Sequence, residues 1–192
     1  MPATRPELHR DIKRGEILDA AETLLLRDGY DNTTMAAIAR AARVANNSVY
    51  WYFPSKDDLL AAVLRRRQER ALTEVADLAT SSVEERVLTL LAQLDQVANL
   101  IAAVHERASH SAAVAETHHA FHAAAGRHLG SGFGNAGLGP QDARRAAAAI
   151  MAMVEGIHLH ERNRDPAVRN QLILWTLHRL VAASADGAAS PP

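Results

Sequence analysis

Residues 46–52 of the chain, "NNSVYWY", concentrate side chains that can recognise a nucleic acid. An asparagine amide can hydrogen-bond adenine at two positions, and a serine hydroxyl can bond a base edge or a phosphate. Tyrosine hydroxyls can hold phosphate oxygens, and the ring of Trp51 can pack against a sugar or a thymine methyl group. The other possibility is that Tyr50, Trp51 and Tyr52 are ordinary core aromatics of a helical protein. The run is therefore a DNA-binding surface or part of a core, and some of its rings can serve both roles, because a ring can pack while its hydroxyl reaches outward.

The residues around this run favour two short helices joined by a tight break. The segment "DNTT" offers an N-cap for a helix over residues 35–42, and a break over 43–45 precedes the second helix. Pro54 ends that second helix, because a proline disfavours the α conformation of the residue before it. Two short helices joined in this way are typical of the helix-turn-helix, whose second helix lies in the major groove of DNA.

The helical period supports an outward-facing role for part of the second helix. At about 100° per residue, Val49 and Phe53 share one face, and Asn47 and Trp51 fall on the opposite face. The pattern predicts a helix that buries two apolar residues and displays polar and aromatic ones.

The rest of the chain predicts an all-α fold with about nine helices and no strand, since Ala and Leu dominate and N-caps recur. We expect helices over 11–28 (ended by Gly29), from Lys56 to about Ala79, over 83–109 with a kink or as two helices, over 111–129, over 141–162, and from Pro166 to about Ala183. Ser82 with Glu85 forms a capping-box spacing, and Asp165 is placed to cap the last helix. The glycine-rich segment "GSGFGNAGLGP" (130–140) is predicted to be a loop.

Composition and charge limit the class of protein without identifying it. The 192 residues contain no cysteine and no run of about 18 uncharged apolar residues, so we expect a cytoplasmic protein with no membrane span. The net charge is −1, and residues 1–64 hold eight Lys and Arg against nine Asp and Glu. Binding to DNA would therefore depend on local placement of basic residues on one face: Arg5, Arg10, Lys13, Arg14, Arg40, Arg43 and Lys56.

Residues 33–63, "TTMAAIARAARVANNSVYWYFPSKDDLLAAV", resemble the signature of TetR-type transcriptional repressors, and the likeness extends over about residues 11–70. The resemblance implies a homodimer that binds a palindromic double-stranded DNA operator and responds to an unknown small-molecule effector, with no cofactor and no enzymatic activity. The DNA-binding residues that it implies are Thr33, Thr34, Arg43, Asn46, Asn47, Ser48, Tyr50, Trp51, Tyr52 and Lys56. Arg43 stands where the family has glycine, so it either adopts a left-handed conformation, at about 1–2 kcal/mol, or takes a different turn.

We expect the chain to divide into an arm (1–10), a DNA-binding domain (11–70, with the helix-turn-helix at 34–53), an effector-binding and dimerisation domain (71–184) and, from its small residues and prolines, a disordered tail (185–192). The candidates for the effector pocket are Leu94, Val97, Leu100, Ile101, Val104, His105, Phe121, Met151 and Val154. The candidates for the dimer interface are Ile150, Met153, Gly156, Ile157, Leu172, Trp175 and Arg179. The interface candidates could instead pack in the core of one chain.

Nine of the ten histidines lie between residues 105 and 178, which raises a metal-binding alternative. His118 and His122 are four apart on one helix, and Glu155 with His158 forms half of a di-metal pattern of helical bundles. Histidines four apart on a helix arise readily by chance, and solvated or core histidines are the simpler interpretation, so we expect no metal site. A helical-bundle enzyme and a helical adaptor without DNA binding are the competing hypotheses for function.

Overall fold

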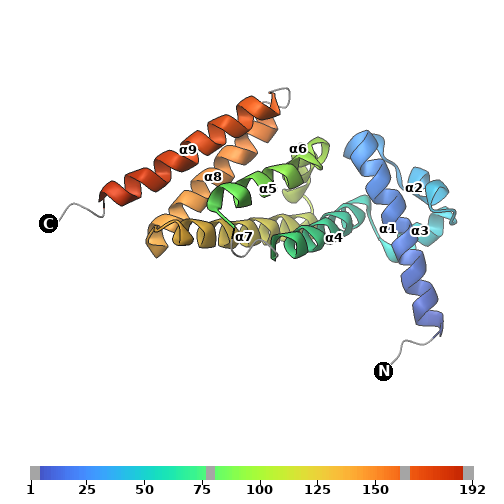
Figure 1. The fold of residues 1–192 in the computed structure, drawn as a ribbon. Coiled ribbons are helices and arrows are strands. Elements are labelled where there is room, and N and C mark those ends of the chain that lie inside the picture. The colour runs from blue at the N-terminus through green and yellow to red at the C-terminus, as the bar shows by residue number, and fades with distance from the viewer. Residues whose placement is uncertain (1–4, 77–80, 161–164, 188–192) are drawn as a thin grey trace. The chain divides into compact units, whose positions relative to one another are not determined.

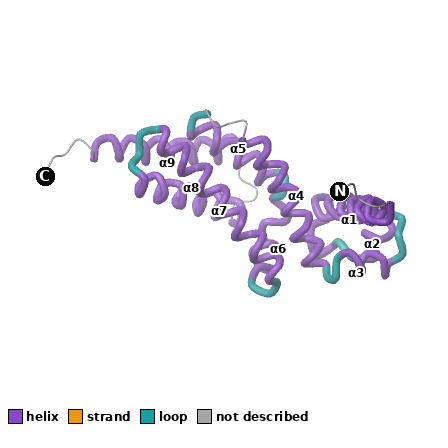
Figure 2. Tube along the Cα trace, turned by 90° about the horizontal axis from the view of Figure 1, so that it is seen from below, coloured by secondary structure: helices purple, strands orange, loops and turns teal. Residues whose placement is uncertain are grey.

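The computed structural model describes residues 5–76, 81–160 and 165–187. These residues form nine α-helices and no strand, as predicted (Figures 1 and 2). The helices are α1 (Arg5–Asn32), α2 (Met35–Ala41), α3 (Asn46–Tyr52), α4 (Lys56–Ala76), α5 (Val83–Asp95), α6 (Ala98–Ala108), α7 (Ala112–Asn135), α8 (Pro140–His160) and α9 (Pro166–Gly187). No single described helix is long and apolar enough to cross a membrane, and α5 with α6 meets that test by length and composition only when the two are taken together.

Several helix starts lie where the capping residues predicted them. The side chain of Thr34 accepts a hydrogen bond from the backbone N–H of Ala37 at 3.1 Å and begins α2. Ser82 and Glu85 form the predicted capping box of α5. Asp165 accepts from the N–H of Ala167 at 2.8 Å, and α9 begins at Pro166. These caps satisfy backbone donors that the first turn of a helix leaves unpaired.

Other boundaries differ from the prediction. Helix α1 begins at Arg5 instead of residue 11, and a break at Gly29 (φ 80°, ψ 173°) precedes its last residues. Helix α9 continues to Gly187. The expected helix ends near Ala79 and residue 162 lie outside the described residues, as do residues 1–4 of the arm, 188–192 of the tail and the side chain of Arg5.

The predicted glycine loop is wrong for residues 130–135, where α7 continues to Asn135. Leu129 and Phe133 are fully buried on this turn of α7. Burying two such side chains stabilises the fold by about 3–6 kcal/mol, which offsets the total penalty of about 3 kcal/mol for the helical glycines Gly130, Gly132 and Gly134. The chain turns only after Asn135, where Gly137 has a φ of 98°.

The chain divides into two compact units. The first comprises residues up to Glu69 together with Asn99–His118, and the second comprises Arg70–Ala98 together with the residues from His119 onward. Residues 99–118 were expected in the effector domain. Three side chains from this segment, Leu100, Val104 and Val114, lie in the buried core of the first unit, which also includes Val49 and Phe53 of the helix-turn-helix.

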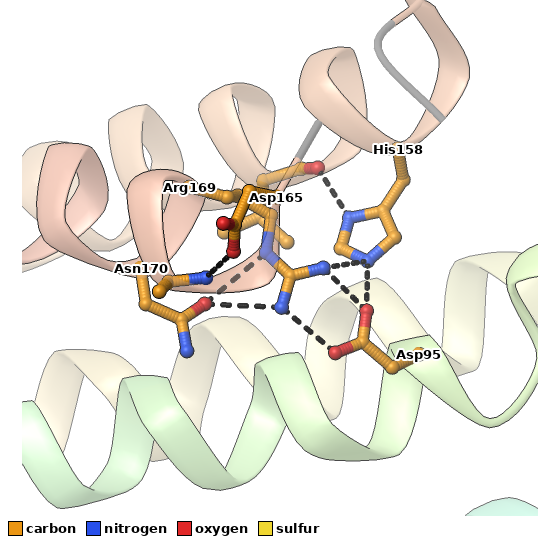
Figure 3. A network of polar contacts seen from close by, with 7 residues as sticks. Asp95, His158, Asp165, Arg169 and Asn170 are labelled. Atoms are coloured by element: carbon orange, nitrogen blue, oxygen red, sulfur yellow. Dashed lines mark hydrogen bonds and ion pairs between the residues drawn. The ribbon is translucent and has the colours of Figure 1, made fainter. Parts of the chain in front are cut away.

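In the second unit, α8 packs along α9, and α5 also contacts α9. The largest fully buried side chains of these helices and of α7 form its apolar core: Leu91, Leu129, Phe133, Ile150, Ile173 and Leu177. A polar network joins α5, α8 and α9 (Figure 3). In it Arg169 of α9, only 7% exposed, donates to both carboxylate oxygens of Asp95 at 2.5 and 2.7 Å.

Candidate nucleic-acid interface

Helix α3 has the two faces that its sequence predicted. Val49 and Phe53 are 0% and 2% exposed, whereas Asn47, Tyr50 and Trp51 are exposed, Trp51 to 66%. Tyr50 and Trp51 are therefore not core aromatics, which removes the alternative for these two rings. Ser48 and Tyr52 are half-buried, and Asn46 is exposed at the first turn of α3.

Tyr52 connects the exposed face of α3 with the core. Its ring packs against the core of the first unit and meets the ring of Trp51 edge-on, with centroids 4.6 Å apart and planes at 88°. Edge-to-face packing is a favoured arrangement for two aromatic rings. The contact holds the indole of Trp51 against a ring that is itself anchored.

Arg43 adopts the left-handed conformation, with a φ of 55°. Among the described residues, Arg43 is the one non-glycine residue with a positive φ. The backbone N–H of Val44 donates to the carbonyl of Ala39 at 3.0 Å, and this bond closes the turn between α2 and α3. Of the two geometries considered from the sequence, the strained one is present, and the Arg43 side chain is exposed beside α3.

The side chains of Thr33 and Lys56 form hydrogen bonds within the first unit. Thr33 is 1% exposed, and its hydroxyl donates to the carbonyl of Gly29 at 2.7 Å. The phosphate contact expected of Thr33 does not fit this burial. The Lys56 ammonium donates to the carbonyls of Tyr30 and Thr33 at 2.9 and 3.1 Å, and lies over the Tyr30 ring. An ammonium group has three N–H donors, and two are used here.

The expected basic face is present in part. Arg10, Arg14, Arg40 and Arg43 are exposed, and the guanidinium of Arg14 lies 4.9 Å from the centroid of the Phe53 ring. Lys13 instead pairs with Glu16 at 2.6 Å.

Helix α6 is joined to α1 and α4 by a polar cluster that sequence spacing could not reveal. Arg107 forms a bidentate pair with Asp57, the second residue of α4, with N–O distances of 3.0 and 2.7 Å. The hydroxyl of Tyr30 donates to the same carboxylate. The hydrogen bond from Arg107 is the main reason that the pKa of Asp57 is below its ordinary value. The side-chain amide of Asn99 in α6 donates hydrogen bonds to the carbonyls of Leu25 and Leu26 in α1.

The nine candidates for the effector pocket divide between the two units. Leu100, Ile101, Val104 and His105 belong to the first unit, and Leu100 and Val104 fill its core. Leu94, Val97, Phe121, Met151 and Val154 belong to the second unit, where Leu94, Met151 and Val154 are buried.

The second unit also has an open groove of about 810 Å³ between α7 and α8 that the sequence did not indicate. Met151 is the one pocket candidate in its lining. Its other walls include Gly126, Gly130, Arg127 and Arg144.

The interface candidates fall into two groups. Leu172, Trp175 and Arg179 of α9 are exposed, and the guanidinium of Arg179 lies 5.6 Å from the centroid of the Trp175 ring. Met153, Gly156 and Ile157 of α8 are half-buried, and Ile150 is fully buried in the core of one chain. Sequence reasoning missed Val168, which is 49% exposed and continues the apolar stripe of α9 one turn before Leu172.

The Glu155 and His158 side chains have different partners. Glu155 lies 2.7 Å from His122 Nε2. His158 Nε2 lies 3.0 Å from Asp95, and its Nδ1 lies 2.8 Å from the Val154 carbonyl oxygen (Figure 3). The pair that suggested half of a di-metal site therefore does not converge on one position.

The chain is similar to known regulators in sequence and in fold. It is 37% identical over 86 residues to the HTH-type transcriptional repressor KstR of Mycolicibacterium smegmatis, a match that covers 44% of this chain and 42% of that repressor. The chain thus spans less than half the length of this curated relative. A transcriptional regulator from Rhodococcus sp. Rha1 has the same fold, with a TM-score of 0.71, 20% identity and 93% and 99% of the two chains covered. A TetR transcription regulator from Haloarcula marismortui matches with a TM-score of 0.75, 18% identity and 91% and 98% covered.

The buried helix-turn-helix core and the exposed face of α3 define a helix-turn-helix DNA-binding protein. The family model for bacterial regulatory proteins of the tetR family matches residues 17–63, which run from α1 into α4. This part of the chain therefore matches the family, and the resemblance found in the sequence is confirmed there. The family consists of regulatory proteins, which favours regulation over the enzyme hypothesis.

Proposed function

We propose that the protein is a homodimeric transcriptional repressor that binds a palindromic DNA operator through α3 and leaves it when a small-molecule effector binds. The observation that carries this proposal is the exposure of Asn47 and Trp51 on a helix whose opposite face, Val49 and Phe53, is buried. A polar and aromatic surface on an anchored second helix suits the major groove.

The residues of the proposed interface have two kinds of role. Asn46, Asn47 and Ser48 are placed at the start of α3 to read base edges. Thr34, Arg43, Tyr50, Tyr52 and the remaining donor of Lys56 are assigned to backbone phosphates, which set the register of the protein on the duplex. Because the first 64 residues carry no net excess of basic charge, we expect binding to weaken only modestly with salt.

We assign the dimer interface to the exposed apolar side chains of α9 together with α8. Val168, Leu172, Trp175 and Arg179 follow one another at helical spacing and are all exposed. A two-fold axis would bury the same patch from both copies. Two copies would then present two α3 helices to the two halves of a palindrome.

The effector is proposed to act through a difference in affinity between two conformations, one of which no longer fits the operator. Helix α6 is fastened to α1 and α4 of the first unit through Asn99 and Arg107. An effector that changes the position of α6 would therefore change the support of α1 and α4.

The test is binding of the full chain to the intergenic DNA that flanks its own gene, measured by gel shift and fluorescence anisotropy at moderate salt. We expect a specific complex, weakened about tenfold or more by Asn47→Ala and by Tyr50→Ala, since each removes a base or backbone contact of α3. Leu88→Ala, a change of an exposed apolar residue on α5, is the control that should leave affinity unchanged.

If the wild-type protein forms no specific complex, the operator hypothesis is wrong. If the double variant Asn47→Ala/Tyr50→Ala keeps every interaction of the wild type, an adaptor without a DNA role is the better description.

A further inference from the structure

The outermost ridge of α3 consists of two side chains, Asn47 and Trp51. They are four residues apart, so they lie on one face of the helix and about 6 Å apart along its axis. Both are exposed, and Trp51, at 66%, is the most exposed large hydrophobic side chain among the described residues. The exposed face of α3 therefore presents the carboxamide of Asn47 and the indole of Trp51 to a binding partner.

The indole of Trp51 is held in this exposed position. Its ring meets the edge of Tyr52, which is packed against the core of the first unit. Burying a large apolar ring is favourable by about 1.5–3 kcal/mol, so a partner that covered the indole of Trp51 would gain free energy from this contact.

The charge around the ridge favours a polyanion as that partner. Helix α3 contains no acidic residue, and the exposed Arg40 and Arg43 precede it at the end of α2 and in the turn. An apolar protein surface would gain nothing from these two guanidinium groups, whereas the phosphates of a duplex would.

The chemistry of the major groove then selects the contacts. The apolar group that a base pair displays there is the C5 methyl of thymine, and the base edge that matches an asparagine amide is that of adenine. Successive base pairs are about 3.4 Å apart, so side chains separated by about 6 Å address base pairs about two steps apart.

From this geometry we infer that Trp51 determines operator specificity by covering a thymine methyl group in each half-site, within about two base pairs of an adenine read by Asn47. The inference rests on the proposed function, which supplies the duplex, and goes beyond it by stating which bases the half-site contains.

The experiment uses the full chain and the tightest-binding duplex selected from a random-sequence library. Each thymine is replaced in turn by uracil, which removes only the methyl group, and affinity is measured by fluorescence anisotropy. We expect one thymine per half-site at which the change weakens binding about fourfold, the equivalent of one buried methyl group. Replacing a nearby adenine by 7-deazaadenine should weaken the wild type and leave Asn47→Ala unaffected.

The variants decide whether Trp51 is responsible. In Trp51→Ala the uracil effect should vanish at that thymine alone. Trp51→Phe keeps a smaller apolar ring and should retain part of the effect, which tests the inference even if the alanine variant binds too weakly. Leu88→Ala should show the wild-type pattern. Circular dichroism melting should be the same for all, because Trp51 is exposed.

Two results would overturn the inference while leaving the proposed function intact. One is a selected duplex with no thymine that is sensitive to uracil, which would place Trp51 on a sugar. The other is a uracil effect of equal size in the wild type, Trp51→Ala and Trp51→Phe. If the library yields no selected duplex at all, the proposed function fails and the inference with it.

Discussion

Arg43 lies in the turn between α2 and α3 and adopts a backbone conformation that is unfavourable for residues other than glycine. Its φ of 55° lies in the left-handed region, where a non-glycine residue is disfavoured by about 1–2 kcal/mol. The turn nevertheless closes, through the bond from Val44 to Ala39 and the burial of Val49 behind it. A strained residue that is also exposed and cationic beside α3 is consistent with a role at the phosphate backbone.

The first prediction concerns Arg43→Gly. Glycine adopts a positive φ without steric penalty, so we expect the free energy of unfolding to rise by about 1 kcal/mol in urea denaturation. Affinity for the operator should fall, because the guanidinium is lost. Arg40→Gly, inside α2 at an ordinary helical φ, is the matched change and should lower stability by a similar amount. A destabilised Arg43→Gly would show that the left-handed geometry is not a source of strain.

At the scale of elements, α7 shows how packing decides whether a glycine-rich stretch is helical. An ideal Cβ at Gly132 would lie 2.7 Å from Cδ of Arg86, a buried residue of α5. Arg86 in turn donates to the carbonyl of His128 at 3.1 Å. The close approach of α5 and α7 therefore needs glycine at position 132, whereas Gly126 has no neighbour within 4 Å of such a Cβ.

We predict opposite effects for two glycine-to-alanine changes in α7. Gly132→Ala should lower the free energy of unfolding by about 1–3 kcal/mol, because Arg86 must move from its buried position. Gly126→Ala should raise it by about 1 kcal/mol, because alanine is the better helix former and meets no clash. Thermal and urea denaturation of both variants measure this. Equal effects of the two changes would contradict the packing argument.

The Asp95 network fastens three helices of the second unit, and its strength depends on pH. The hydrogen bonds from Arg169, and secondarily the contact with His158, lower the pKa of the Asp95 carboxyl below its ordinary value of 3.8. A carboxyl with a lowered pKa in the folded state stabilises the protein above its unfolded pKa. That stabilisation is lost as the pH falls from about 4 through the lower folded value.

Asp95→Asn should therefore remove one acid-sensitive part of the stability. At pH 7 we expect a loss of about 2 kcal/mol, because the buried Arg169 loses its carboxylate while Asp95 itself is 40% exposed. The difference between variant and wild type should shrink as the pH is lowered below about 4. Asp142→Asn breaks an exposed pair with Arg145 and should change stability by less than about 0.5 kcal/mol. A pH-independent difference for Asp95→Asn would refute the linkage.

At the scale of the whole molecule, the proposed dimer depends on the stripe of α9. Trp175 is 58% exposed and Leu172 is 37% exposed, and both lie on the side of α9 away from the buried Ile173 and Leu177. Exposed aromatic side chains next to arginine are typical of the residues that dominate protein interfaces.

We predict that Leu172→Glu/Trp175→Glu converts the proposed dimer to a monomer. The dissociation constant of the dimer should rise about 100-fold or more, since two apolar anchors per copy become charged. Sedimentation velocity measures this, and operator affinity should fall in parallel because only one α3 then binds. Leu88→Glu, at the exposed Leu88 of α5, should leave the dimer unchanged. A double variant that still sediments as a dimer would move the interface elsewhere.

The sequence alone determined the helical class, most helix starts and the outward face of α3. These features depend on residues within four positions of one another: caps such as Thr34, Ser82 and Asp165, and the spacing of Val49 and Phe53. Capping hydrogen bonds and helical periodicity depend only on residues close together in the sequence, so the sequence alone predicts them.

Only the tertiary structure decided the rest. It buried Thr33, continued α7 through its glycines, and placed α6 in the unit of the helix-turn-helix. It also paired Arg107 with Asp57 and Arg169 with Asp95, partners that lie 50 and 74 positions apart. No spacing rule connects such residues, because which of many charged side chains meet depends on how the helices pack. The resemblance in the sequence predicted a DNA-binding domain over residues 11–70, and the packing places residues 99–118 in the same compact unit as the helix-turn-helix.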